Sequence, residues 1–542
     1  MRCEDESRRD HEIDYAFWRR MSRTERAGKG FAASIVQFCA QMLVQVLLAP
    51  IVLRVAGRET LGAYAAIMQA LNFLYLFDVV GDWSLERFLA QATGLNDGGA
   101  RFRTLFTTAR SLYWIINSFF AIATLIFSVF LGRIFHLSPA VALEARHALW
   151  VIAIWSIIRV PLMAYGTAMI ATQDIAAANM ISALGSSLRA LASLGYVLAG
   201  GGLFGLMLAG TSAEAISLLF YRRRFRKMNP GLIPKWGLPD RALLREMIKF
   251  GANAAILNVG NMLCFSSGNV VAGLTGGAVA ASCFYSTQMP AIMTNNMLGR
   301  LNESATPALN ELFGRGEIDR VRMVFSRLIR LQLFLVLPLS VGVLLFNRDL
   351  VTAWVGERQY AGNMLTIFLS IYCVINAIQG IALRYSYVFG WMRLLATTSI
   401  LQGIAGFGLG LYLSRIMGLG GIGVALVASV IPQVVILFYK IGQSLSVDVG
   451  SALVRCVLRS AFPLIAASAV GLAVHSYVSI RTHHFGSLLA ECLSFAATYF
   501  LLAYFMFLVD RDRDDLKLLA RGLANQSFGM GARVSRALGI TS

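Results

Sequence analysis

The sequence is poor in charged residues, which make up 14% of its 542 positions, whereas apolar residues make up 57%. A soluble globular protein carries about a quarter charged residues, so this composition argues against a soluble domain. The apolar residues recur in runs of about 20, the length of a helix that crosses a hydrocarbon core of about 30 Å. The composition therefore predicts an all-α polytopic membrane protein.

The chain also lacks the residue groupings that hold metals, cofactors or disulfide frameworks. Its seven cysteines form no CxxC pair, and all of them except Cys3 lie within apolar runs. Its six histidines include one adjacent pair, His483 and His484, without further ligands nearby in the sequence. Cysteine and histidine spacing of this kind indicates neither a metal site nor a redox motif. We therefore expect no metal, no cofactor and no catalytic residue.

A cleavable signal peptide and a long external loop are missing as well. Residues 1–30 are polar and mixed in charge, without the early apolar core of a signal peptide. The loops predicted on the outer face are short. A membrane-bound polymerase, ligase or glycosyltransferase needs acidic or histidine groups on a larger ordered segment, so an enzyme is the less favoured alternative.

The formal net charge of +19 could indicate a nucleic-acid partner, but its distribution argues against one. The arginines gather between apolar runs, as expected of topology signals. With a cytoplasmic N-terminus, the external segments hold eight of the 48 lysines and arginines. This asymmetry predicts an even number of spans and places both termini in the cytoplasm.

Fourteen transmembrane helices are predicted from the apolar runs. They lie at 31–54, 61–82, 104–131, 148–172, 175–200, 202–221, 250–274, 277–299, 326–347, 361–386, 394–416, 419–440, 456–480 and 486–509.

The sequence repeats itself at an offset of about 218 residues. Six matches occur in order along the chain. They are Phe31 with Phe250, Gly57 with Gly276, Glu86 with Glu303, Arg110 with Arg327, Gly205 with Gly423, and Leu219-Phe220-Tyr221 with Leu437-Phe438-Tyr439. Each repeat contains six spans, so both enter the membrane in the same sense. Lobes related in this way place a substrate between them.

The repeat divides the chain into a predicted order of segments. These are a cytoplasmic tail (1–30), an N-lobe of six helices (31–221), a basic cytoplasmic linker (222–249), a C-lobe of six helices (250–440), extra helices 13 and 14 (441–509) and a cytoplasmic tail (510–542).

Three charged residues fall deep within predicted spans: Arg159, Arg189 and Glu214. At 1.5 Å per residue, both arginines lie about 20 Å from the cytoplasmic ends of their spans, whereas Glu214 lies about 10 Å from its own. The two arginines therefore share a level and Glu214 lies lower, so a direct Arg189–Glu214 pair is not expected. Ionisable residues at such depth are costly and usually mark function.

Arg159 and Arg189 are predicted to bind substrate in a cationic cavity, because a guanidinium group binds phosphate and carboxylate oxygens in pairs. Helix-to-helix ion pairing is the alternative. Glu214 is a candidate for proton coupling or for an ion pair, since an apolar site favours the neutral carboxyl. The corresponding positions of the second repeat carry no charge. Weaker candidates for the same cleft are Asp78, Arg384, Gln41, Gln45, Asn253, Asn258 and Asn261.

Two segments carry a family resemblance: RALLREMIKFG at 241–251 and LNESATPALNELFGRGEIDRVRMVFSRLIR at 301–330. Together with the two lobes and the two extra helices, they resemble the polysaccharide transporter (Wzx-type flippase) branch of the multidrug/oligosaccharidyl-lipid/polysaccharide (MOP) exporter superfamily. The resemblance implies a flippase in a bacterial cytoplasmic (inner) membrane. It would move an undecaprenyl-pyrophosphate-linked oligosaccharide to the outer leaflet for lipopolysaccharide or exopolysaccharide biosynthesis.

The resemblance also bears on partners and on the alternatives. It implies contact with membrane lipids and with a polysaccharide polymerase and export machinery, and no nucleic acid. Arg159 and Arg189 fit the family's cationic cavity by position. A cation-coupled multidrug exporter of the same superfamily stays open, although such a transporter needs acidic residues deep in a lobe.

Overall fold

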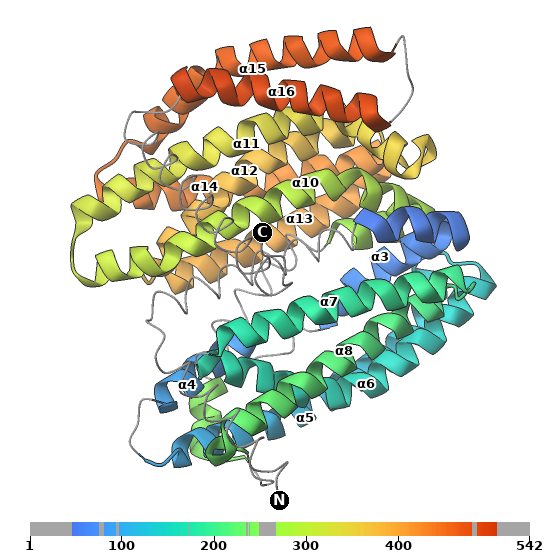
Figure 1. Cartoon of the computed structure of the whole chain (residues 1–542), viewed down its shortest axis with the longest axis vertical. Coiled ribbons are helices and arrows are strands. Elements are labelled where there is room, and N and C mark those ends of the chain that lie inside the picture. The colour runs from blue at the N-terminus through green and yellow to red at the C-terminus, as the bar shows by residue number, and fades with distance from the viewer. Residues whose placement is uncertain are drawn as a thin grey trace, which may run out of the picture. The chain divides into compact units, whose positions relative to one another are not determined.

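A computed structural model of the chain describes residues 46–74, 81–93, 97–172, 174–234, 237, 239–248, 267–479 and 485–506. Within these ranges the chain is almost entirely helical and contains no strand (Figure 1). Eleven helices of this part of the chain are long and apolar enough to cross a membrane. The prediction of an all-α polytopic membrane protein is therefore confirmed.

The eleven membrane-length helices are α5, α6, α7, α8, α10, α11, α12, α13, α14, α15 and α16. Their bounds are Ala100–Ile134, Pro139–Ala171, Ile175–Leu198, Leu203–Met228, Gly268–Gly314, Ile318–Val355, Asn363–Val388, Met392–Met417, Leu419–Leu445, Val449–Ser479 and Phe485–Met506. Two shorter helices, α3 (Gly57–Leu74) and α4 (Gly81–Thr93), precede them. Eleven predicted spans each coincide with one long helix, and the other three (31–54, 61–82 and 250–274) lie partly outside the described residues.

Helix ends recur at nearly the offset of the sequence repeat. Helices α5 and α11 begin at Ala100 and Ile318, and α8 and α14 end at Met228 and Leu445. The helix boundaries of the first sequence repeat thus recur in the second repeat. The boundaries assigned to the two lobes stay a prediction.

Helix α10 contains a kink at the place where the sequence separates two spans. Gly277 has φ +75° inside this helix, and glycine adopts that backbone conformation without the steric cost that a side chain adds. The kink explains why the apolar pattern breaks at 275–276 although the chain stays helical on both sides.

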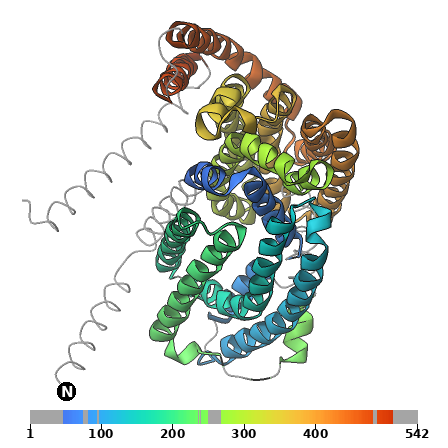
Figure 2. The same cartoon turned by 90° about the vertical axis from the view of Figure 1, so that its right-hand side faces the viewer.

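By their internal contacts, the described residues form two compact units. One contains the chain up to Ser286 together with Ala396–Ile422, and the other contains Thr287–Leu395 and the chain from Gly423 onward. In the first unit, α5 packs on α6, and α8 packs on both α6 and α7 (Figures 1 and 2). In the second unit, α15 and α16 pack on each other and on α11.

An aromatic cluster holds one end of the first unit. Phe106 of α5 lies 5.1 Å from Tyr165 of α6 and 5.8 Å from Phe225 of α8, measured between ring centroids. All three side chains are buried, and aromatic pairs in such edge-to-face arrangements add about 1 kcal/mol each beyond the burial of their area. The cluster therefore fixes α5, α6 and α8 to one another.

Helix α4 covers this cluster and is absent from the predicted spans. Its buried residues Leu85, Phe88, Leu89 and Ala92 follow the i, i+3, i+4, i+7 spacing of one helix face. Of this helix, only residues 81 and 82 fall within a predicted span, 61–82. The helix is amphipathic, 13 residues long, and thus too short to cross a membrane.

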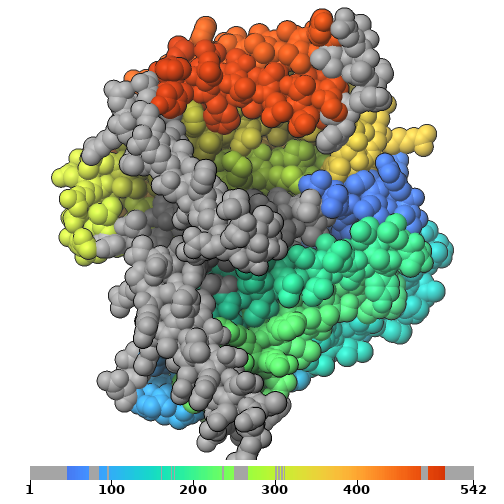
Figure 3. All heavy atoms as spheres, viewed as in Figure 1, coloured from blue at the N-terminus to red at the C-terminus, as the bar shows by residue number. Residues whose placement is uncertain are grey.

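Helices α15 and α16 show a broad face to the outside (Figure 3). Large apolar side chains on this pair are exposed, among them Leu458, Ile465, Leu501 and Phe505. A surface this apolar is expected for lipid contact in a protein whose solvent is hydrocarbon.

Candidate functional site

A cavity of about 720 Å³ lies within the first unit. Its wall comes from α3, α4, α6, α7, α8, the first part of α10 and the helical residues Val46–Val55. The lining residues are Leu48, Tyr64, Glu86, Met163, Gly166, Thr167, Ile170, Ser182, Gly185, Ser186, Arg189, Ser193, Glu214, Ser217, Leu218, Tyr221 and Tyr285. Hydroxyl groups are the most frequent polar groups in this wall.

Arg189 lies where this cavity meets a smaller one of about 200 Å³, and it lines both. The side chain is half-buried on α7. Within the described ranges, no carboxylate forms an ion pair with its guanidinium group. Arg189 therefore presents fixed donors and a positive charge to the cavity.

Arg159 is held differently, although its helix borders the same space. Its Nε lies 2.8 Å from Oε1 of Glu214, and both side chains are 19% exposed. The indole N–H of Trp155, one turn earlier on α6, donates to Oε2 of Glu214 at 3.5 Å. The spacing of four residues places Trp155 and Arg159 on one face of α6. That face meets α8, so the ion pair joins α6 to α8.

The level predicted for Glu214 relative to Arg159 was wrong, because the ion pair places Glu214 beside this arginine and not below it. The prediction ended this span at residue 221, before three arginines, but α8 continues to Met228. The 2.8 Å contact with Arg159 places Glu214 at the level of that arginine, and 14 residues, or about 20 Å, separate it from the end of its helix. The helix continues through the arginines because Phe225 is buried in the aromatic cluster, and long basic side chains extend to water from such positions.

The cavity is therefore not cationic as predicted: among the described residues its lining carries one arginine, Arg189, and two carboxylates, a formal charge of −1. Arg159 lines only the smaller cavity and is neutralised by Glu214. Glu86 of α4 adds a second carboxylate to the wall. Among the described lining residues, Arg189 brings the positive charge to the larger cavity, where hydroxyl groups and both carboxylates also line the wall.

A stripe of small polar residues on α7 contributes much of the cavity wall and was not identified from the sequence. Ser182, Ser186, Arg189 and Ser193 line the cavity from this one helix. Their spacing of four, three and four residues is the helical period. This helical spacing of polar residues was the signal from which the sequence could have identified the stripe. Hydroxyl groups both donate and accept hydrogen bonds.

The remaining predicted residues do not join this cavity. Arg384 lies near the end of α12 in the second unit and does not line it. The other weaker candidates, Asp78, Gln41, Gln45, Asn253, Asn258 and Asn261, lie outside the described residues. Arg159 and Arg189 remain candidates for substrate binding as a prediction.

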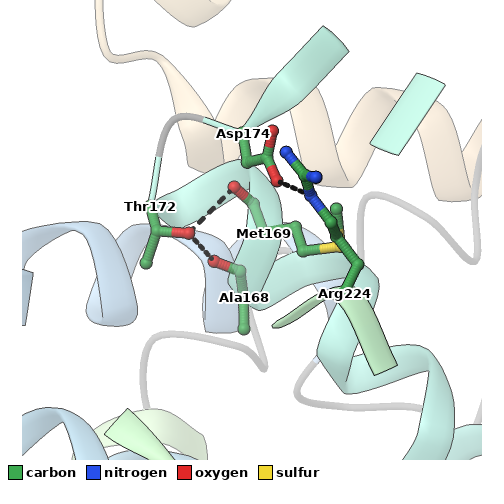
Figure 4. A network of polar contacts seen from close by, with 5 residues as sticks. All are labelled: Ala168, Met169, Thr172, Asp174 and Arg224. Carbon is green, nitrogen blue, oxygen red and sulfur yellow. Dashed lines mark hydrogen bonds and ion pairs between the residues drawn. The ribbon is translucent and has the colours of Figure 1, made fainter. Parts of the chain in front are cut away.

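Polar contacts tie together the helix ends at one side of the cavity (Figure 4). The hydroxyl of Thr172 donates to the carbonyl oxygens of Ala168 and Met169 at 3.0 and 3.1 Å, where α6 ends. Asp174, just before α7, accepts from Nε of Arg224 on α8 at 3.1 Å. Burial raises the pKa of Asp174, and its bond to Arg224 offsets part of that rise. The Asp174–Arg224 ion pair thus connects the start of α7 to α8, whereas the Thr172 bonds stay within the last turn of α6.

Acidic, histidine and cysteine side chains do not gather into a metal site in the described ranges, where no three of them lie together.

Comparison with known proteins identifies the fold. The lipid II flippase MurJ in an inward closed conformation is 11% identical, with a TM-score of 0.70 over 88% of this chain and 97% of that one. An inward-facing multidrug resistance MATE family transporter of the MOP superfamily is 14% identical, with a TM-score of 0.64 over 76% and 98%. A MOP superfamily transporter from Pyrococcus furiosus is 15% identical, with a TM-score of 0.59 over 79% and 97%.

The chain thus has the fold of MOP superfamily transporters, as the sequence resemblance predicted. No curated protein sequence matches it. A family model described as polysaccharide biosynthesis protein matches residues 51–361. Because this match spans more than half of the chain, the protein belongs to the polysaccharide biosynthesis protein family.

Proposed function

We propose that this protein is a flippase for an undecaprenyl-pyrophosphate-linked oligosaccharide. It would move this lipid from the inner to the outer leaflet of a bacterial cytoplasmic membrane, for lipopolysaccharide or exopolysaccharide biosynthesis. The observation that carries the proposal is Arg189, a guanidinium without a carboxylate partner among the described residues, in a wall rich in hydroxyl groups. Membership in a polysaccharide biosynthesis family supports the choice of a glycan-carrying substrate.

The head group of such a lipid has two parts with different chemistry. The pyrophosphate is an oxyanion, and the forked donors of Arg189 suit it. The sugars need many hydrogen-bond partners, and the hydroxyl oxygens of Ser186 on α7 and Tyr221 on α8 supply acceptors, since their O–H groups already donate to the carbonyl oxygens of Ser182 and Ala178. The polyprenyl tail stays in the bilayer, so its apolar surface does not have to move into water.

Movement across the membrane would occur by alternating access of two repeated lobes, without a chemical step. Accordingly we assign no catalytic residue and no cofactor. Both termini face the cytoplasm in this proposal. A polysaccharide polymerase and an export machinery would take the product on the outer face.

Flipping of a fluorescent lipid-linked oligosaccharide in liposomes tests the proposal. We expect Arg189→Gln to reduce the rate by at least tenfold, because a charge-assisted hydrogen bond contributes about 1.5–3 kcal/mol. Arg189→Lys keeps the charge but loses the fork, so an intermediate rate is expected. Arg133→Gln is the matched control, since Arg133 lies exposed at the end of α5 in the same unit. Liposomes with the wild-type chain that do not exceed empty liposomes would refute the function.

A cation-coupled multidrug exporter is the second candidate, and one observation favours it. The carboxylates of Glu86 and Glu214 both line the cavity, and acidic residues inside a transporter can bind Na⁺ or H⁺. Dye efflux from cells that depends on a Na⁺ or pH gradient, and that Glu86→Gln abolishes, would favour this candidate over the flippase.

A further inference from the structure

A second group of arginines lies within the second unit, where α11 packs against α15. They line a cavity of about 280 Å³. Arg330 reaches it from α11, and Arg455 and Arg459 reach it from α15, one turn apart. Neither the sequence repeat nor the proposed transport cavity involves these residues.

The three arginines share the lining of one small cavity. Cys456, which lies between Arg455 and Arg459 in the sequence, lines the same cavity. Nε of Arg455 donates to the carbonyl oxygen of Ser451 at 3.1 Å, which leaves its two terminal nitrogens as further donors. The site thus concentrates positive charge from two helices on one small space.

One carboxylate lines this cavity among the described residues, that of Asp448. It is engaged at the start of α15, where it accepts from the backbone N–H of Ser451 at 3.1 Å and from the Ser451 hydroxyl. These bonds, together with the nearby charge of Arg455, lower the pKa of Asp448. With Asp448 ionised, the lining still carries a formal charge of +2. The cavity is therefore suited to an anion.

The arginines lie near the predicted cytoplasmic boundary, since the spans predicted for α11 and α15 begin at 326 and 456, within four residues of each arginine. Helix α11 has 38 residues and is thus about 57 Å long, well beyond a hydrocarbon core of about 30 Å. Arg330 lies 12 residues from its start, and Arg455 and Arg459 lie six and ten residues from the start of α15. Both helix starts lie on the side predicted to be cytoplasmic.

An apolar surface continues from the arginines along α15. Leu458, Phe462 and Ile465 are 67%, 58% and 69% exposed. Leu458 lies between Arg455 and Arg459, and Phe462 and Ile465 follow toward the middle of the helix, at spacings that keep all three near one face. An anion bound at the arginines would therefore have an apolar surface beside it, which a soluble phosphate cannot use and an acyl chain can.

We propose that Arg330, Arg455 and Arg459 bind the phosphate of an anionic glycerophospholipid from the cytoplasmic leaflet, with its acyl chains along α15. Forked guanidinium donors suit the phosphate oxygens, and basic residues near the membrane surface attract anionic head groups. The lipid would connect α11 to α15 at a site separate from the substrate cavity.

Native mass spectrometry of the purified full-length protein tests this site. We expect phosphatidylglycerol to be retained and phosphatidylcholine to be lost. Each of Arg330→Gln, Arg455→Gln and Arg459→Gln should weaken phosphatidylglycerol binding by about fivefold. Arg327→Gln is the matched control, since Arg327 is exposed on α11 and does not line the cavity.

Two comparisons keep the result interpretable. The charge-retaining pair Arg455→Lys and Arg459→Lys should keep most of the binding, and it serves as the test if the glutamine variants fail to fold. Inorganic pyrophosphate should not displace phosphatidylglycerol, because it gains nothing from the apolar face of α15. Equal retention of both lipids, undiminished binding in the folded triple-glutamine variant, or displacement by pyrophosphate would overturn the proposal.

Discussion

The ion pair between Arg159 and Glu214 allows a quantitative test of how α6 is joined to α8. Glu214→Gln removes the negative partner and leaves a mostly buried guanidinium group, with a side chain only 19% exposed. Removing one partner of a buried pair costs about 3–5 kcal/mol, and the partial exposure favours the lower limit. We therefore expect a loss of about 3 kcal/mol in the free energy of unfolding.

The double variant Arg159→Met/Glu214→Gln distinguishes a true pair from two independent charges. Replacement of both charges by uncharged groups of similar size is often close to neutral, so the double variant should recover most of the loss. The assay is equilibrium unfolding of the purified protein in mixed detergent micelles, followed by circular dichroism. Losses that simply add in the double variant would refute the pairing.

Two further predictions concern helix packing and pH. Gly62→Ala should destabilise the first unit by about 1–3 kcal/mol, because the added methyl group would collide with the backbone carbonyl of Ala278. Gly210→Ala, where the space is open, should be neutral or stabilising in the same equilibrium unfolding assay. The pKa of Asp174 is raised in the folded chain by burial, so folding favours its protonation. Unfolding free energy should therefore rise as pH falls from above the folded pKa toward the unfolded value, and Asp174→Asn should lose this rise; an unchanged pH profile in that variant would contradict the assignment.

The sequence predicted those features that depend on long-range apolar pattern. Eleven spans coincide with long helices, and the break between two spans falls at the Gly277 kink. Apolar length is dictated by bilayer thickness, so it is visible without tertiary information. Helix α4 escaped prediction because an amphipathic helix of 13 residues carries no such signal.

The charge distribution of the cavity was harder to predict because it depends on which arginine forms an ion pair with which carboxylate. Arg159 and Arg189 look equivalent in the sequence, but only Arg159 has a carboxylate partner among the described residues. That partner, Glu214, was misplaced because a charged run was taken as the end of α8. Pairing between helices follows from their rotation and relative height, which composition does not reveal.

A second buried carboxylate was overlooked for a related reason. Glu491 of α16 lies within a predicted span, is 3% exposed, and lies 3.0 Å from Nδ1 of His475 on α15. Its partner is on the preceding helix, so it belongs to the α15–α16 contact and not to the cavity. A charge inside a span therefore indicates a partner or a ligand, and the structure distinguishes the two.

The most direct test of the central claim is the rate at which liposomes containing the purified protein flip a labelled undecaprenyl-pyrophosphate-linked oligosaccharide. Wild-type protein and Arg133→Gln should flip at equal rates, Arg189→Lys more slowly, and Arg189→Gln at least tenfold more slowly, since one charge-assisted contact of about 1.5–3 kcal/mol is lost. Flipping by a folded Arg189→Gln variant at the wild-type rate would contradict the role of Arg189 in holding the pyrophosphate.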